Sequence, residues 1–135
     1  MIKKAIVFVI YDLATKKYLV ENRTDKQTMS GEKVFPGGKV KNSEIANLTK
    51  TLFRELKEEL GIKPKKYKYL GKPTVGINGF ELYSFLVTSW EGKIPNKILD
   101  KGSTLEWLGS EEFKPNIKPV REILKLVKSC VAQSH

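Results

Sequence analysis

The chain has little of the side-chain chemistry on which many enzymes depend. It contains one cysteine, Cys130, and one histidine, His135, which is its final residue. A single cysteine excludes an intramolecular disulfide, and a chain end is a poor place for a catalytic histidine because termini fray. Ser-His-Asp and Cys-His mechanisms are therefore excluded. Any general acid or base has to be a carboxylate, a lysine, a tyrosine or a metal-bound water.

Long apolar runs are also missing. The longest one near the N-terminus, Ala5 to Tyr11, is too short to cross a membrane and lacks the pattern of a signal peptide. With 135 residues, of which 30% are charged, the sequence suits one compact domain covering 1–135. We expect a soluble, cytoplasmic protein without a membrane partner, and the sequence leaves open whether it is a monomer or a homodimer.

Positive charge is what the chain has in excess. It carries 25 Lys and Arg residues against 15 Asp and Glu residues, a formal net charge of +10. Such a field favours polyanions such as nucleotides or nucleic acid. A solvated lysine-rich surface explains the same charge equally well, because the lysines are scattered along the chain. Charge alone does not choose between these interpretations.

The apolar pattern predicts an α/β protein with a mixed sheet. Leucines at every fourth position predict a helix over 47–60, with Gly61 at its end and Ser43 or Asn47 as its cap. A second helical pattern covers 119–131. Strands are predicted at 3–11, 18–23, 67–70, 80–90 and 105–108, and a short strand over 34–40 is interrupted at Pro36. Helices are expected on both faces of the sheet, because both faces are apolar.

The first helix carries the most informative chemistry. Glu55, Glu58 and Glu59 share one helical face beside the leucine stripe, because residues three and four apart are neighbours. Three adjacent carboxylates repel each other, and a divalent cation removes the conflict. Oxygen ligands without nearby Cys or His favour Mg²⁺, with Mn²⁺ as the alternative. Taken alone, the triplet also fits a solvated acidic face that lysines neutralise.

The segment from Phe35 to Lys39 adds a second feature. It places Gly37 and Gly38 where the chain leaves a strand. Glycine lets the backbone approach a ligand closely, and a carbonyl exposed there can join a metal shell. A Gly-Gly pair alone is weak evidence, since it usually marks a turn.

Together, Gly38, Glu44 and the run from Arg54 to Ile62 resemble the Nudix box. The run matches that motif at every defined position, whereas Arg54 follows Glu44 by ten residues and not by the usual eight. The resemblance implies a Nudix α/β/α sandwich with a central mixed sheet. It also implies water attack on a pyrophosphate, with Mg²⁺ held by Glu55, Glu58, Glu59 and the Gly37 carbonyl. Arg54 would orient a glutamate, and Glu44 would have a supporting role that its spacing leaves open.

The segment 35–40 is similar to that of MutT-type members of the family, which act on oxidised purine nucleotides. This resemblance implies further candidate residues for substrate binding: Arg23, Phe35, Gly38, Lys39 and Asn116. Phe80, Tyr83 and Phe85 are additional candidates for stacking on a base, although most aromatic residues on strands belong to the core. Asp100 and Glu106 are candidates for the extra acid that some members draw from a loop nearer the C-terminus. The general base is left open among Glu55, Glu59 and that loop acid.

The expected activity is Mg²⁺-dependent hydrolysis of a nucleoside triphosphate, such as 8-oxo-dGTP, to the monophosphate and pyrophosphate. Other Nudix substrates stay open: ADP-ribose, a dinucleoside polyphosphate or the 5′ end of an RNA. A rival from another class is a nucleotide- or RNA-binding module without catalysis. The net charge of +10 slightly favours the module, and the intact glutamates oppose it.

Overall fold

The computed structural model describes residues 3–24, 30–95, 99 and 102–133. In chain order its elements are β1 (Lys3–Asp12), β2 (Lys17–Asn22), β3 (Lys33–Val34), β4 (Gly37–Lys39), the 3₁₀ helix η1 (Asn42–Glu44), α1 (Leu48–Glu55), the π-helix η2 (Leu56–Leu60), β5 (Lys63–Gly71), β6 (Phe80–Glu91), β7 (Thr104–Leu108) and α2 (Lys118–Gln133). Among the described residues, none of the helices has the length and apolar character needed to span a membrane.

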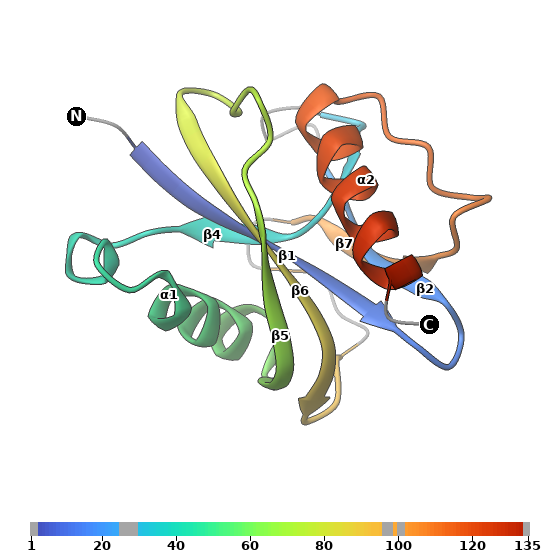
Figure 1. The fold of residues 1–135 in the computed structure, drawn as a ribbon, viewed down its shortest axis with the longest axis horizontal. Helices are drawn as coiled ribbons and strands as arrows, with labels where there is room; N and C mark the ends of the chain where they lie inside the picture. Colours follow the sequence, from blue (N-terminus) through green and yellow to red (C-terminus); the bar gives the residue numbers. More distant parts are fainter. Residues whose placement is uncertain (1–2, 25–29, 96–98, 100–101, 134–135) are drawn as a thin grey trace.

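The strands form a mixed sheet in the order β3-β2-β1-β6-β5, with β4 also paired to β1 and β7 to β2. β1 runs parallel to β6 and antiparallel to β2 and β4. Figure 1 shows α1 and α2 on opposite sides of these strands. The predicted α/β/α sandwich is therefore confirmed.

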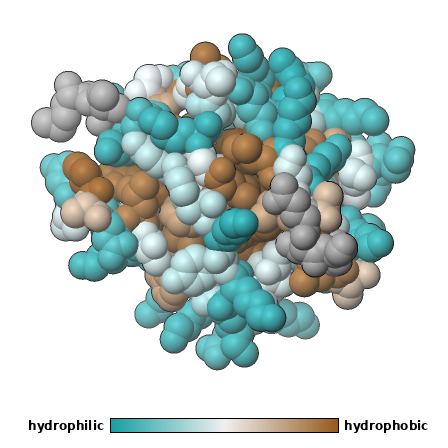
Figure 2. Space-filling model, in the orientation of Figure 1, coloured by the Kyte–Doolittle hydropathy of each residue, from teal (hydrophilic) through white to brown (hydrophobic). Residues whose placement is uncertain are grey.

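Alternation along β1 divides the apolar residues between two cores. Val7 and Val9 face α2, where they pack in a cluster that includes Ile123. Phe8, which is fully buried, faces the other way into the cluster that includes Leu52. Successive strand residues point to opposite faces, so a continuous apolar strand needs cover on both sides. Figure 2 shows hydrophilic residues along most of the outline, with hydrophobic residues surfacing in the middle of this face.

The break predicted at Pro36 is the point where the chain changes its pairing partner. Val34 pairs with Glu21 of β2, whereas Gly37 pairs with Val7 of β1. The Pro36 carbonyl accepts a hydrogen bond from the Phe8 amide at 3.0 Å. Proline has no amide donor, so it cannot continue a ladder on both sides. This crossing brings the glycine pair beneath α1.

The first helix differs from the regular α-helix that the leucine spacing predicts. Asn47 is its N-cap, whose side chain accepts from the Thr49 amide, and its α-helical part extends over Leu48–Glu55. One π turn, Leu56–Leu60, follows, and Gly61 with a φ of 67° ends it. Glu58 and Glu59 thus stand on a widened turn. Such π turns are rare and often occur at functional sites.

The second helix and the outer strands agree with the sequence pattern to within a few residues. The helix predicted over 119–131 extends over Lys118–Gln133. The strand predicted at 67–70 is longer in the structure, where it extends over Lys63–Gly71. The prediction missed its first residues because this part of the edge strand β5 is rich in exposed lysines, which give no apolar signal. Edge strands commonly carry such lysines, which discourage pairing with other chains.

Candidate active site

The glycine pair makes room for a buried carboxylate. A Cβ atom on Gly38 would lie 2.1 Å from Cδ of Glu55 and 2.4 Å from both of its carboxylate oxygens. Glu55 is 8% exposed, and its carboxylate therefore occupies the space that a side chain at position 38 would fill. A Cβ on Gly37 would instead lie 2.2 Å from the backbone oxygen of Ile6. Each glycine is needed for a close approach, one to a carboxylate and one to a strand.

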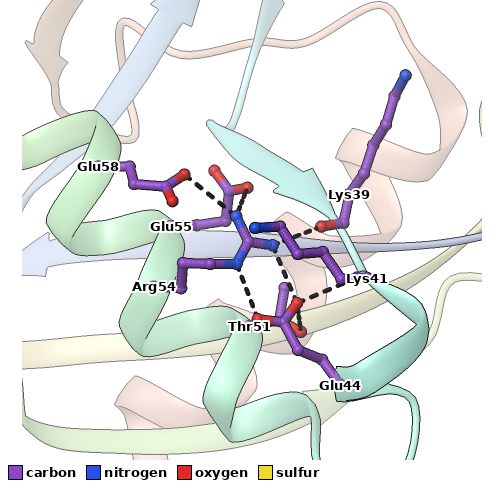
Figure 3. A network of polar contacts seen from close by, with 7 residues as sticks. All are labelled: Lys39, Lys41, Glu44, Thr51, Arg54, Glu55 and Glu58. Carbon is purple, nitrogen blue, oxygen red and sulfur yellow. Dashed lines mark hydrogen bonds and ion pairs between the residues drawn. The ribbon is translucent and has the colours of Figure 1, made fainter.

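Arg54 connects the acidic residues of this site (Figure 3). Its Nη1 donates to Oε1 of Glu55 at 2.8 Å and to Oε2 of Glu58 at 3.1 Å. Its Nη2 donates to the Lys39 carbonyl at 2.9 Å, which fastens β4 to the helix. An orienting role for Arg54 would use contacts of this kind, and that role stays a prediction. The residue also forms the plain i, i+4 ion pair with Glu58 that was the alternative.

Glu44 lies against the other side of the same guanidinium. Its Oε2 accepts from Nε of Arg54 at 2.8 Å and its Oε1 accepts from Nη2 at 2.9 Å, a two-point ion pair. Oε1 also accepts from the Thr51 hydroxyl at 2.9 Å and from the Lys41 amide at 3.1 Å. The ten-residue spacing thus keeps Glu44 in contact with Arg54. The hydrogen bonds from Arg54, more than any other contact, lower the pKa of Glu44 to about 2.

Replacing Glu44 by glutamine is expected to destabilise the fold by about 1–3 kcal/mol at neutral pH, because Arg54 loses its buried partner. A carboxyl whose pKa is lower in the folded state stabilises that state above its unfolded pKa. The folded pKa is about 2 against an ordinary value of 4.5, so this contribution should fade as the pH falls through that window. Denaturant unfolding of both proteins from pH 7 to pH 2 tests this. A difference in stability that does not change with pH would contradict it.

The donors suit a hard divalent cation. Glu55, Glu58 and Glu59 supply only carboxylate oxygens, and the Gly38 cradle holds the first of them in place. Across the part of the chain that the structure describes, no three acidic, His or Cys side chains converge on one point. Nη1 of Arg54 binds both Glu55 and Glu58 in this arrangement. The residues fit a metal in their chemistry, while their metal-binding roles stay predictions.

A cavity of about 440 Å³ opens beside the glycine pair. Four of the residues predicted to bind substrate line it, namely Arg23, Phe35, Gly38 and Lys39. The predicted metal ligand Gly37 lines it as well. Nη1 of Arg23 donates to Oε2 of Glu21 at 2.9 Å. The Phe35 ring is 5% exposed and packs edge-on against Phe113 with centroids 5.2 Å apart. Phe35 is thus largely a core residue with one side on the cavity.

Most other residues of the cavity wall were not singled out as binding residues from the sequence, among them Glu21, Ile77 and Asn78. Glu21 is 1% exposed, and its position in the sequence predicts only that it belongs to a strand. Asn78 has a φ of 51° and precedes Gly79, a pair typical of tight turns. That signal locates a turn between strands without showing that it faces a cavity. Of the aromatic candidates, Phe80 lines the cavity.

Tyr83 and Phe85 are placed differently from Phe80. Both belong to the core beneath α1, on the face of the sheet away from α2. The cavity, in contrast, receives Val120 and Ile123 from α2. Their suggested role in base stacking therefore does not agree with the structure, because strand alternation turns them to the opposite face.

Other predicted residues lie apart from the cavity. Asn116 is exposed and donates to Oε2 of Glu32 at 3.3 Å, and it does not line the cavity as a base-reading residue should. Glu106 accepts from Lys33 at 2.8 Å and from Asn22 at 2.7 Å. These bonds lower the pKa of Glu106 and give it a local structural role. Asp100 lies outside the described residues.

Comparison with known proteins identifies the family of the chain. The family model of the NUDIX domain matches residues 1–127. The 8-oxo-dGTP diphosphatase of Buchnera aphidicola is 32% identical over 128 residues, which cover 90% of this chain and 94% of that protein. The 8-oxo-dGTP diphosphatase of Escherichia coli is 30% identical over 113 residues, covering 78% and 84%.

Solved structures of similar fold include a member of the same family. The crystal structure of the MutT NUDIX hydrolase from Burkholderia pseudomallei superimposes with a TM-score of 0.74 at 20% identity, covering 93% of this chain and 97% of that one. The family match spans both core clusters, the glycine pair and the three glutamates. The chain therefore belongs to the Nudix family and is a Nudix pyrophosphohydrolase.

Proposed function

We propose that the protein hydrolyses a nucleoside triphosphate to the monophosphate and pyrophosphate with Mg²⁺, and that 8-oxo-dGTP is its preferred substrate. One observation carries the proposal: Gly38 lines the nucleotide-sized cavity and at the same time packs against the Glu55 carboxylate. A base in the cavity would thus place its phosphates beside the glutamates. The names of the two curated relatives support the choice of an oxidised purine.

The cavity suits a purine nucleoside. Most of its wall is apolar and comes from β1, β6 and α2, while the polar side chains are few: Glu21, Arg23, Lys39 and Asn78. Small-molecule sites usually have this character, with apolar walls for contact area and a few polar groups for orientation. Phe35 and Phe80 offer aromatic faces or edges to a base. Arg23, fixed by Glu21, has donors to offer a base or phosphate oxygen.

The catalytic roles follow from the contacts. Glu55, Glu58, Glu59 and the Gly37 carbonyl would hold Mg²⁺, which when bound neutralises phosphate charge and lowers the pKa of water. Arg54 orients Glu55 and Glu58, and Glu44 holds Arg54 from behind. The proton of the attacking water passes to Glu55 or Glu59, the two carboxylates that are less exposed than Glu58. The ammonium group of Lys39 lies near enough to the cavity to contact a phosphate.

A panel of nucleotides tests the substrate assignment. Purified protein with Mg²⁺ is given 8-oxo-dGTP, dGTP, dATP, ADP-ribose and a dinucleoside polyphosphate, and kcat/KM is measured for each. We expect 8-oxo-dGTP to give the highest value, with pyrophosphate and not orthophosphate released. Preparations of the Glu58→Gln variant control for contaminating phosphatases. If ADP-ribose or the dinucleoside polyphosphate is preferred to every triphosphate, the proposal is wrong.

A further inference from the structure

Two tyrosines of the edge strand β5 are exposed on the face of the sheet that carries α1. Tyr67 is 42% exposed and Tyr69 is 48% exposed. Their direct partners on β6 are Val87 and Phe85, which belong to the core beneath α1. Residues directly opposite each other on paired strands point to the same face. Both tyrosines therefore lie on the α1 face, where the helix leaves them exposed.

Neighbouring rings hold the two tyrosines in place. Tyr67 packs edge-on against Phe53 of α1, with centroids 5.4 Å apart. Tyr69 packs edge-on against Phe85 at 5.4 Å and stacks on Tyr83 at 6.5 Å. Residues two apart on a strand lie about 7 Å from each other. Tyr67, Tyr69 and Tyr83 thus form a row of rigid rings, the tyrosine row, which a flat ligand can cover at low entropic cost.

Lysines border the tyrosine row and give it a positive field. Nζ of Lys4 and Nζ of Lys72 each lie 5.4 Å from the centre of the Tyr83 ring. Glu81 and Glu91 offset part of the positive charge through ion pairs. The strand β5 itself carries four exposed lysines and no acidic residue: Lys63, Lys65, Lys66 and Lys68. Protection of a sheet edge accounts for such lysines but does not account for the exposed rings between them.

We infer that the tyrosine row is a binding surface for single-stranded nucleic acid. Bases of the strand would stack on the Tyr67 and Tyr69 rings, and its phosphates would contact the lysines. Aromatic platforms in a positive field bind single strands in this way, with little sequence preference. A duplex hides the faces of its bases and should bind more weakly.

This surface is separate from the nucleotide cavity. The cavity receives Val120 and Ile123 from α2, on the other face of the sheet, and neither Tyr67 nor Tyr69 lines it. Binding of a strand to the tyrosine row requires neither a divalent metal nor hydrolysis. The inference therefore goes beyond the proposed function.

Two double variants that differ in the presence of the rings test the surface. Tyr67→Ala/Tyr69→Ala removes both rings, whereas the control Tyr67→Phe/Tyr69→Phe keeps them and removes only the hydroxyls. Fluorescence anisotropy measures the binding of labelled oligothymidine and oligouridine of about twelve nucleotides, with EDTA present. We expect at least about tenfold weaker binding for the alanine pair and less than about twofold change for the phenylalanine pair, because each stacked ring contributes to affinity.

A charge-matched pair of variants tests the lysines. Lys4→Gln/Lys72→Gln removes the two cations beside Tyr83, and the control Lys125→Gln/Lys128→Gln removes two exposed cations from α2. Each pair removes the same charge. At about 0.15 M salt we expect about fivefold weaker binding in the first pair and less than about twofold in the control, because distant charges are screened.

Equal binding by the alanine and phenylalanine pairs, equal binding of a duplex, or no binding to the unaltered protein would overturn the surface. Thermal unfolding shows whether each variant is folded, and the single variant Tyr69→Ala serves if the alanine pair is not. Hydrolysis of 8-oxo-dGTP should stay within about twofold in every variant, as for most surface substitutions. A matching loss of hydrolysis would contradict a separate surface, whereas an unaltered protein that binds the strand without hydrolysing nucleotides would contradict the proposed function alone.

Discussion

Replacing Glu58 by glutamine is expected to lower kcat about 10³-fold, since a lost metal ligand removes several kcal/mol of stabilisation of the transition-state charge. The side chain of Glu58 is 55% exposed, so its change to an isosteric amide should alter the melting temperature little. Steady-state hydrolysis and a thermal melt measure the two effects separately.

The matched control is Lys57→Gln, an exposed neighbour on the same π turn. It changes the charge of the turn by one unit and does not touch the Arg54 network. We expect it to keep kcat within about twofold of the unaltered protein, as surface substitutions usually do. Equal losses in both variants would mean that the turn and not the carboxylate matters. Full activity of Glu58→Gln would remove this residue from the metal site.

Replacing Gly38 by alanine is expected to lower kcat about 10²-fold, because a displacement of about 1 Å at a catalytic group has this effect. The new Cβ would lie 2.1 Å from Cδ of Glu55, so the carboxylate has to leave its position. The contact is with the end of a side chain, which can rotate. Activity should therefore fall more than stability, and measuring kcat and the melting temperature together tests this.

Two other glycines serve as controls for Gly38→Ala. Gly37→Ala would meet the backbone oxygen of Ile6 at 2.2 Å, so it should destabilise the fold more strongly than Gly38→Ala. Gly109→Ala would meet only Oε1 of Glu112 at 3.5 Å, an ordinary contact, and should be neutral. If Gly38→Ala unfolds the protein as readily as Gly37→Ala, the cradle for Glu55 is not the reason for this glycine.

The sequence predicted the parts of the site that depend on local spacing. Glu55 and Glu58 lie three residues apart on one helix, so the pattern already places them together. Pro36 and the two glycines mark a break in pairing for reasons of backbone chemistry. The break is found where it was predicted. These features need no knowledge of the rest of the chain.

The parts that the sequence did not predict depend on distant segments. Glu44 meets Arg54 because η1 folds back against α1, and spacing alone had left this contact open. The π turn that carries Glu58 and Glu59 could not be predicted, since its residues have ordinary helical propensity. Residues from β1, β2, β6 and α2 line the cavity. No local sequence pattern predicts that Asn78 lines it while Asn116 does not. The Glu44–Arg54 contact and the lining of the cavity depend on tertiary contacts between segments that are distant in the sequence.

A divalent ion held by the glutamates beside the glycine pair is central to the proposed function. Titration of Mn²⁺ followed by electron paramagnetic resonance measures this binding directly, without nucleotide and without turnover. We predict that the unaltered protein removes free Mn²⁺ signal, and that Glu58→Gln binds the ion at least about tenfold more weakly while Lys57→Gln binds it normally. Equal Mn²⁺ affinity in all three proteins, or no binding at millimolar concentration, would contradict the central claim.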